Sequence, residues 1–277
     1  MFGKYLDRVR EAAPLIHNIT NYVTVNDVAN ILLACGASPI MADDPNEVED
    51  ITSICAGLNI NIGTLNSHTV PSMLLAGRTA VRLGHPVLLD PVGAGASSYR
   101  TETAQRLLEE IGPDVIRGNI SEIRTLTVNQ AGASRGVDAS LTDAVTEEGL
   151  REAVDFMRDQ AERLHCVLVV TGAIDLVADG QTCYCIRNGR PEMGKITGTG
   201  CQLSGLMTAF LAANPEHKTE AAAAAVAVMG LAGEIGWDRM EPGDGNATYR
   251  NRIIDAVYHM KGTALDRGAK IEIYAPR

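Results

Sequence analysis

The amino-acid sequence predicts an α/β fold in which a central, mostly parallel sheet carries helices on both faces. Short β-branched segments alternate along the chain with longer segments of helical periodicity, as in strands joined by crossover helices. Hydrophobic residues make up 45% of the 277 residues and aromatic residues only 4%, so we expect an aliphatic, alanine-rich core. No repeat, low-complexity stretch or linker is apparent, so residues 1–277 are expected to form a single domain.

Strands are expected where a short apolar run is bounded by Gly, Pro, Asp or Asn. Five such runs are SPIMA (38–42), LNINIG (58–63), PVLLD (86–90), DVIRGN (114–119) and CVLVVTG (166–172). Between them, apolar residues recur at helical spacing over residues 21–36, 46–57, 67–84 and 142–165. The pair Asn46 and Glu49 resembles a capping box at the start of the second of these predicted helices.

The pattern changes after Gly172. IDLVADG, QTCYCIRNG and PEMGKIT predict short strands joined by turns, which indicates an antiparallel edge. Helices are expected at 200–213, 218–236 and about 247–262, followed by a last strand, IEIYA. The alanine-rich run from Ala221 is shorter than the about 20 apolar residues of a membrane span and is flanked by Glu220 and Glu234. It predicts a buried helix, and no membrane association is expected.

The composition argues against several classes of function. With a formal net charge of −10 and no basic stripe, the chain is not expected to bind nucleic acid. Its first residues, MFGKYLDRVREAA, alternate charged and apolar residues and resemble neither a signal peptide nor a transit peptide. The six cysteines lack the density of a disulfide framework and form no CxxC pair for zinc. Reduced thiols in a cytoplasmic protein are therefore expected.

Polar motifs follow the predicted strands. They are VLLDPVGAG (87–95), VIRGNISEI (115–123), VVTG (169–172) and KITGTGCQLSG (195–205). Because ligands of open α/β sheets bind beyond the carboxyl ends of the strands, we expect these motifs to meet in one crevice. A further motif, HNITNYVTVNDVAN (17–30), is densely polar for a strand–helix junction. Its asparagines are suited to a neutral polar ligand, whereas a lone histidine such as His17 is more often structural.

The loop made of Gly198, Thr199, Gly200 and Cys201 is a candidate anion site. Its glycines allow positive φ and close approach, and the helix that follows contributes partial positive charge at its N-terminus. An ordinary glycine turn before a helix is the alternative. A dinucleotide fingerprint fits poorly, because no clear buried strand precedes the loop and no downstream acid on a second strand could bind a ribose.

Two carboxylates are candidates for a magnesium site. Asp90 ends an apolar strand, where a charge needs a cation or hydrogen bonds, although capping the next element is an alternative role. Glu122 lies near Arg117 and Asn119, and Ser121 is a candidate cap for a short helix there. This set suits metal-bound water and phosphate oxygens; the alternative is a capped surface helix with a solvated glutamate.

The combination of an anion loop, two carboxylates and an arginine is what phosphoryl transfer requires, because its catalysis is mostly positioning and charge neutralisation. The chain has no Walker GxxxxGK[ST] motif and no protein-kinase loops, so it predicts a kinase of another class.

Seven motifs, in order, resemble the hydroxyethylthiazole kinase family of the ribokinase-like superfamily. They are HNITNYV, SPIMA, LNINIGTL, VLLDPVGAG, RGNISEI, VVTG and ITGTGCQLSG, and the resemblance covers nearly the whole chain. It implies a ribokinase-like fold without the lid domain and a homotrimer with the thiazole site at the subunit interface. It also implies that ATP and Mg²⁺ phosphorylate the hydroxyl of 4-methyl-5-(2-hydroxyethyl)thiazole, in thiamine salvage.

The resemblance further implies roles for residues within these motifs. The thiazole is expected to meet Met41, Asn21, Val23 and Gly198, with Gly63 and Thr64 facing it from a neighbouring subunit. ATP is expected to meet Arg117, Thr171 and Asn119, and magnesium is expected to be held through water by Asp90 and Glu122. The loop from Gly198 to Cys201 is expected to form the anion hole around the transferring group.

Cys201 stands where many ribokinase-like enzymes have an aspartate that acts as a base. A thiol at a helix N-terminus is expected to have a lowered pKa and so to accept a proton weakly. We therefore expect the anion hole and Mg²⁺ to carry most of the catalysis. The rival interpretations are a hydroxymethylpyrimidine kinase, an ATP-dependent dehydratase that repairs hydrated NAD(P)H, a non-catalytic thiazole or nucleotide sensor, and a Rossmann oxidoreductase.

Overall fold

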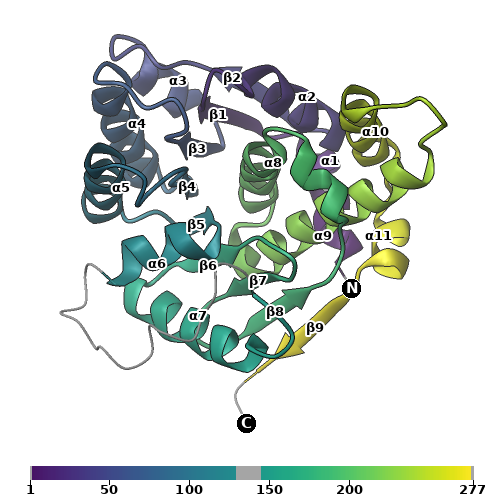
Figure 1. Ribbon diagram of the computed structural model, residues 1–277. Helices are drawn as coiled ribbons and strands as arrows, with labels where there is room; N and C mark the ends of the chain where they lie inside the picture. Colours follow the sequence, from purple (N-terminus) through teal and green to yellow (C-terminus); the bar gives the residue numbers. More distant parts are fainter. Residues whose placement is uncertain (1, 129–144, 276–277) are drawn as a thin grey trace.

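The computed structural model describes residues 2–128 and 145–275, in which one nine-stranded sheet has the order β2-β1-β3-β4-β5-β6-β7-β8-β9 (Figure 1). The strands from β1 to β6 are parallel, and β7, β8 and β9 continue the sheet in antiparallel pairing. The strands are β1 (Leu15–Ile19), β2 (Ser38–Met41), β3 (Gly57–Asn61), β4 (Val87–Asp90), β5 (Val115–Gly118), β6 (Val167–Val170), β7 (Asp175–Ala178), β8 (Cys183–Ile186) and β9 (Ile271–Tyr274). The predicted α/β class and its antiparallel edge are confirmed.

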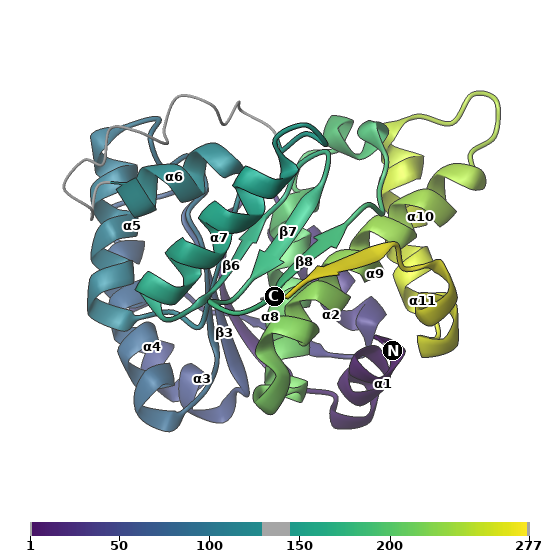
Figure 2. The same cartoon turned by 90° about the horizontal axis from the view of Figure 1, so that it is seen from below.

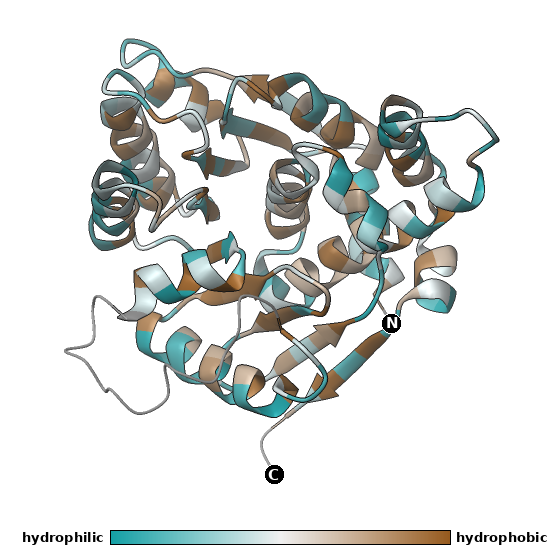
Figure 3. Ribbon diagram, in the orientation of Figure 1, coloured by the Kyte–Doolittle hydropathy of each residue, from teal (hydrophilic) through white to brown (hydrophobic). Residues whose placement is uncertain are grey.

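Helices cover both faces of the sheet, and each face has its own apolar core (Figures 1 and 2). One face carries α1 (Gly3–Ala12), α2 (Val25–Cys35), α8 (Thr199–Ala213), α9 (Lys218–Asp238), α10 (Asn246–His259) and α11 (Gly262–Gly268). The other carries α3 (Val48–Ile54), α4 (Thr69–Leu83), α5 (Ser98–Ile111), α6 (Ile120–Val128) and α7 (Leu150–Leu164). Helices α4, α5 and α7 alternate hydrophilic and hydrophobic residues, as expected of helices with one solvent face (Figure 3).

Helix α9 is the buried helix that the alanine-rich run predicts. It is long and apolar enough to cross a membrane by length and composition, but 83% of its most apolar window is buried inside the protein, as in a core helix. It packs between α8 and α10, and side chains no larger than alanine at most of its contact positions permit this close approach.

The order of the first strands creates a switch point. Strand β2 pairs with one edge of β1 and β3 with the other. The chain therefore passes from β1 to β2 on one side of β1 and then crosses to β3 on its other side. Helix α2 lies on one face and α3 on the other, and the crevice that results opens at the carboxyl ends of β1 and β3. Helix α8 packs against β1, β3 and β4 at this point (Figure 1).

Several predicted elements differ in the structure. PEMGKIT is not a strand, because Pro191–Lys195 forms a 3₁₀ helix. The predicted helix at about 247–262 ends at His259, and a separate helix, α11, follows. Gly262, the first residue of α11, packs against Gly3. A Cβ added to Gly3 would lie 2.2 Å from the Gly262 carbonyl oxygen. Residues 142–144 of the predicted helix 142–165 lie outside the described residues, and α7 begins at Leu150.

Local signals explain further differences. No capping box forms at Asn46, because Asp44 accepts hydrogen bonds from its backbone N–H and its side-chain amide, both at 2.8 Å, and α3 starts later, at Val48. Helices α1 and α5 and strand β1 were not predicted. In β1 the polar residues His17 and Asn18 interrupt the apolar run, although both are buried.

His17 has the structural role that was favoured for it. Its ring nitrogens lie 2.9 Å from the Thr52 hydroxyl and 2.9 Å from the Ala42 carbonyl oxygen, which ties β1 to the segment after β2. Burial lowers the pKa of this ring, so it is neutral near pH 7 and donates from Nε2 to the carbonyl oxygen.

Candidate active site

The residues that the motifs single out gather at the carboxyl ends of the parallel strands. Asn21 follows β1, Met41 ends β2, Gly63 and Thr64 follow β3, Asp90 ends β4, Arg117 and Asn119 lie in and after β5, and Thr171 follows β6. The loop of Gly198 and Thr199 opens α8 among these strand ends. These residues therefore lie at one edge of the sheet, as the motif positions predict.

The two glycines of this loop are required by close contacts. Gly198 has φ +85°, and an added Cβ would lie 2.2 Å from Thr24 Cγ2. At Gly200 an added Cβ would lie 2.5 Å from Arg117 Nη1. Within the described residues no side chain caps α8, so its first backbone N–H groups are available to an anion.

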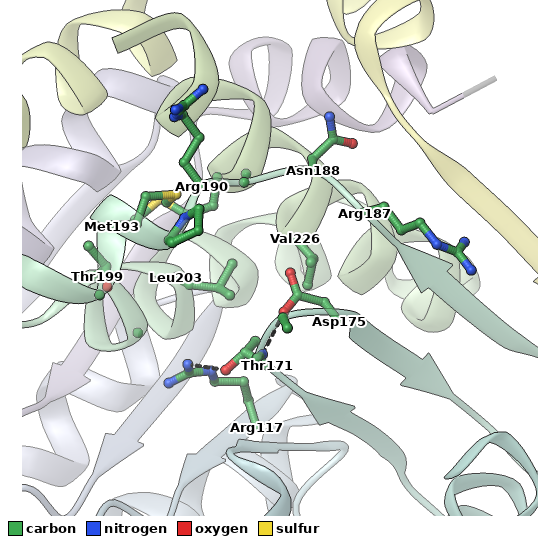
Figure 4. Close-up of a pocket in the computed structure, with 18 residues that line it drawn as sticks. Arg117, Thr171, Asp175, Arg187, Asn188, Arg190, Met193, Thr199, Leu203 and Val226 are labelled. Carbon is green, nitrogen blue, oxygen red and sulfur yellow. Dashed lines mark hydrogen bonds between the residues drawn. The ribbon is translucent and has the colours of Figure 1, made fainter. Parts of the chain in front are cut away.

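Arg117 connects this loop to Thr171 after β6 and to Asp90 at the end of β4. Its Nη2 donates to Thr171 Oγ1 at 2.5 Å (Figure 4), and its Nη1 lies 3.4 Å from Asp90 Oδ2. The Arg117 side chain is only 12% exposed, so water screens its charge weakly. A fixed, poorly screened guanidinium beside free backbone N–H groups is suited to phosphate.

An open cavity of about 570 Å³ lies beside Arg117 and Thr171 (Figure 4). Its lining is mostly small and apolar, and it reaches the first turn of α8 at Thr199 and Gly200. It also contains residues Gly172, Ala173, Asp175, Arg187, Asn188, Gly189, Arg190, Pro191, Met193, Gly194, Leu203, Val226, Met229 and Gly230. The size of the cavity, and Arg117 at the end near α8, are suited to a nucleotide with its phosphates at the α8 N-terminus.

Asp90 is fully buried beside Arg117, close to the start of α8. Its Oδ2 accepts hydrogen bonds from Asn61 Nδ2 and Ser204 Oγ, both at 2.7 Å, while Oδ1 is buried without a hydrogen-bond partner. Burial raises the pKa of Asp90, although Arg117 opposes this. A buried carboxylate oxygen without a donor is costly in apolar surroundings and is chemically suited to a hard cation. Asp90 therefore fits Mg²⁺.

Glu122 lies on the other side of this region, at the start of α6. Its Oε1 accepts from the Gly93 N–H and its Oε2 from the Asn119 N–H, while Asn119 Oδ1 accepts from the Glu122 N–H, all at 2.8 Å. This reciprocal pair is a capping box, so Asn119 caps α6 and the expectation that Ser121 does so is wrong. No group of three or more His, Cys, Asp or Glu residues that could hold a metal occurs within residues 2–128 and 145–275. A cation here would need oxygen ligands from the substrate or from water.

Cys201 lies at the junction of α8 with β1 and β3. Its Sγ accepts from Asn21 Nδ2 at 3.1 Å and from Asn61 Nδ2 at 3.3 Å, and it is the only one of the six cysteines that is not fully buried. Burial and the nearby Asp90 raise the pKa of the thiol despite these hydrogen bonds. The expected lowering of its pKa is therefore wrong, because desolvation and a neighbouring carboxylate outweigh the helix terminus.

The residues predicted to meet the acceptor differ in exposure. Asn21 and Gly63 contact the Cys201 region, because an added Cβ at Gly63 would lie 2.9 Å from Asn21 Nδ2. Thr64 Oγ1 accepts from the Tyr22 N–H at 3.1 Å, and Met41 is half-buried at the end of β2. Val23 is 67% exposed and lies at the surface of this chain.

Three residues of the site were missed in the sequence. Asn61 and Ser204 both bind Asp90, and Arg100 donates to the carbonyl oxygens of Ile62, Gly63 and Val92, each at 2.7 Å. The sequence pattern does not single out Asn61, because LNINIG alternates apolar and polar residues as a half-buried strand does, and Asn61 would then face solvent. Both faces of β3 are in fact buried.

Comparison with known proteins agrees with this geometry. The Hydroxyethylthiazole kinase family matches residues 6–263. A hydroxyethylthiazole kinase of Clostridium acetobutylicum is 54% identical over 274 residues, which cover 99% of this chain and 100% of that protein. The structure of a hydroxyethylthiazole kinase protein from Pyrococcus horikoshii OT3 has a TM-score of 0.87 and 34% identity, covering 99% of this chain and 98% of that one.

A putative ribokinase II of E. coli in complex with ATP and Mg²⁺ shares the fold, with a TM-score of 0.51 and 14% identity over 91% of this chain and 87% of that one. The fold is thus ribokinase-like, with a mostly parallel sheet between two layers of helices. At the level of sequence, the match spans nearly the whole chain and the identity reaches 54%. The chain belongs to the hydroxyethylthiazole kinase family.

Proposed function

We propose that this protein transfers the γ-phosphoryl group of ATP to the hydroxyl of 4-methyl-5-(2-hydroxyethyl)thiazole, the reaction of thiamine salvage. The observation that carries the proposal is the junction at Gly200, where the nucleotide-sized cavity, Arg117 and the uncapped N-terminus of α8 lie next to Cys201. A donor and an acceptor bound on the two sides of this junction would meet at its backbone N–H groups.

ATP would lie in the cavity with its phosphates towards α8. Arg117 and Thr171 would then contact phosphate oxygens, and the hydrogen bond between them holds the guanidinium in place beforehand. Asn119 would act mainly by positioning Glu122, because its side-chain oxygen is engaged in the capping box. This preorganisation lowers the reorganisation needed as charge develops during transfer.

Mg²⁺ would be held by Asp90, whose Oδ1 lacks a donor, and through water by Glu122. When bound, it neutralises phosphate charge and orients the transferring group. Asp90 is itself fixed by Asn61 and Ser204, so its free oxygen points in one direction.

The acceptor hydroxyl would lie next to Cys201. A thiol with a raised pKa is a weak proton acceptor, so the main contribution of Cys201 would be to contact the acceptor alcohol. A loose, metaphosphate-like transition state requires little deprotonation of the attacking oxygen, which is compatible with a thiol in place of a stronger base.

The thiazole ring would contact Met41 and Asn21, with Gly198 beside the reacting hydroxyl. Val23 is too exposed to form a pocket wall in one chain, and the neighbouring Tyr22 is 62% exposed. We therefore propose a homotrimer in which this exposed surface meets a neighbouring subunit beside the thiazole site. Gly63 and Thr64, expected to face the thiazole from a neighbouring subunit, contact Asn21 and Tyr22 of their own chain. A cytoplasmic location is part of the proposal, and it is supported by six cysteines that are all free.

The test is ADP release by purified protein with Mg-ATP and a panel of acceptors. We expect turnover with the thiazole alcohol and little with hydroxymethylpyrimidine or hydrated NADPH. Turnover with either of the others instead would assign the protein to another ribokinase-like activity, and ATP binding without turnover would indicate a sensor. Size-exclusion chromatography with light scattering tests the trimer.

A further inference from the structure

We propose that Asn61 is a positioning residue for phosphoryl transfer: its amide holds the Cys201 thiol, on the acceptor side, in a fixed relation to Asp90, on the metal side. This inference rests on the proposed function and extends it to a residue of the LNINIGTL motif to which the resemblance assigns no role. It depends on four contacts of one buried side chain.

Asn61 ends β3, and in the parallel register of β3 and β4 it lies directly beside Asp90. Its Nδ2 donates to Asp90 Oδ2 at 2.7 Å and lies 3.3 Å from Cys201 Sγ. Its Oδ1 accepts from the Gly63 N–H at 2.9 Å and from Asn21 Nδ2 at 3.0 Å. Both hydrogens and both lone pairs of this amide are therefore used.

The orientation of the amide follows from its partners. The Gly63 N–H can only donate, so it requires the oxygen of Asn61 on that side. The nitrogen must then face Asp90 and Cys201. An aspartate in this place would lose both donated bonds and put a second carboxylate 2.7 Å from Asp90 Oδ2, so only the amide satisfies both sides.

Asn61 also connects two series of side-chain contacts that reach the start of α8 from opposite sides. From Asn61 one series runs through Asn21 to Thr24, whose N–H and hydroxyl donate to Asn21 Oδ1 at 3.2 and 3.0 Å, and Thr24 packs against Gly198. The other series runs through Asp90 to Arg117, which packs against Gly200. The anion loop is thus held from both sides, and Asn61 is the link between them.

Asn59 provides the contrast. It lies two residues earlier on β3, on the same face and equally buried, but its Nδ2 donates to Asn18 Oδ1 at 3.0 Å and its Oδ1 has no partner. It contacts neither Asp90 nor Cys201. A purely structural asparagine on this strand would behave as Asn59 does.

The experiment compares Asn61→Ala with Asn59→Ala by kcat, by KM for ATP and by melting temperature. We expect Asn61→Ala to lower kcat by about tenfold to a hundredfold with KM for ATP changed by less than about twofold, because an offset of about 1 Å between reacting groups costs this much. Asn59→Ala should lose thermal stability but keep kcat within about threefold of the wild type. Equal effects of the two variants on kcat would overturn the proposal.

A double-mutant cycle with Cys201→Ala separates positioning from general damage. If Asn61 acts in part through the thiol, the combined loss in kcat should be at least about threefold smaller than the product of the single losses. The cycle of Asn59→Ala with Cys201→Ala should be multiplicative. A multiplicative Asn61 cycle would contradict the proposal. If Asn61→Ala does not fold, Asn61→Ser, which removes the amide but keeps a small polar side chain and adds no charge beside Asp90, takes its place and should show the same loss in kcat.

Alkylation of Cys201 by iodoacetamide, followed by mass spectrometry of its peptide, gives a readout that does not depend on turnover. Asn61→Ala should change the rate at this thiol by about threefold or more at fixed pH, because the sulfur loses one of its two amide donors, while Asn59→Ala should not. An unchanged rate would refute the positioning role. If the wild type phosphorylates no alcohol, the proposed function fails, and the alkylation comparison still decides what Asn61 does.

Discussion

The substitution Gly200→Ala tests the anion loop most sharply. The added Cβ would lie 2.5 and 2.6 Å from the two terminal nitrogens of Arg117 and 2.9 Å from its Cζ, against an ordinary contact of 3.4–4 Å. The guanidinium must therefore move by about 1 Å, and a displacement of this size typically costs about a hundredfold in rate. This corresponds to about 2.7 kcal/mol of lost transition-state stabilisation.

The folded state should be affected far less than the rate. Alanine is favoured over glycine in a helix by up to about 1 kcal/mol, which offsets part of the strain and part of the weakened Arg117–Asp90 ion pair. We therefore expect kcat to fall by about a hundredfold while the melting temperature changes by only a few degrees.

The assay is ADP release at saturating ATP and thiazole alcohol, with melting followed by circular dichroism. Gly245→Ala is the matched control, because this glycine also lies at a helix start, at α10, and an added Cβ there would meet nothing within 4 Å. A Gly200→Ala enzyme with kcat within about threefold of the wild type would refute the role given to Arg117. A loss of rate that merely follows a large drop in melting temperature would refute it as well.

Three further predictions concern single side chains. Cys201→Ala should lower kcat by no more than about a hundredfold, because a positioned base contributes about 10²–10⁴-fold and this thiol is a poor base. Cys201→Asp should preserve or raise kcat. A folded but inactive Cys201→Asp enzyme would contradict this. Asp90→Asn should lower the rate at ordinary magnesium by about 10³-fold and raise the magnesium concentration needed for half-maximal rate, and an unchanged magnesium dependence would argue against a ligand role. Burial raises the pKa of Asp175 to about 7 from an ordinary 3.8, so its proton is held more tightly in the folded state, and the stability it contributes at low pH is lost as the pH rises through about 7. Asp175→Asn should therefore flatten the fall in melting temperature between about pH 4 and 7, and an unchanged slope would show that Asp175 does not titrate in this range.

Much of the fold can be predicted from the sequence because its signals are local. The alternation of β-branched runs and amphipathic segments indicates the parallel sheet, and turn residues mark most strand ends. Strand β1 escapes prediction because His17 is held by Thr52 and Ala42, and Asn18 accepts from Asn59, distant partners that no local pattern reveals. The 3₁₀ helix at Pro191–Lys195 is missed for a related reason, since PEMGKIT has no periodicity long enough to separate a strand from a short helix.

The site is predictable to the extent that its residues occupy strand ends. Gly198 and Gly200 are correctly singled out as positions of close approach, although only the structure shows that Thr24 and Arg117 are what they approach. Asn61 is not predictable, because its value lies in contacts to Asp90 and Cys201, 29 and 140 residues away. The pKa of Cys201 is mispredicted because a helix terminus can be read from sequence, whereas burial beside Asp90 cannot.

The central claim is that phosphoryl transfer takes place where the proposed nucleotide cavity meets the first turn of α8, beside Cys201. Its most direct test is a single turnover with ATP labelled at the γ-phosphate, enzyme in excess and the thiazole alcohol present, with the products separated by chromatography. We predict that the label moves to the alcohol phosphate with the wild type and, more slowly, with Cys201→Ala, whereas it stays in ATP with Asp90→Asn. Label that stays in ATP with the wild type, or appears as inorganic phosphate whether or not the alcohol is present, would contradict the claim.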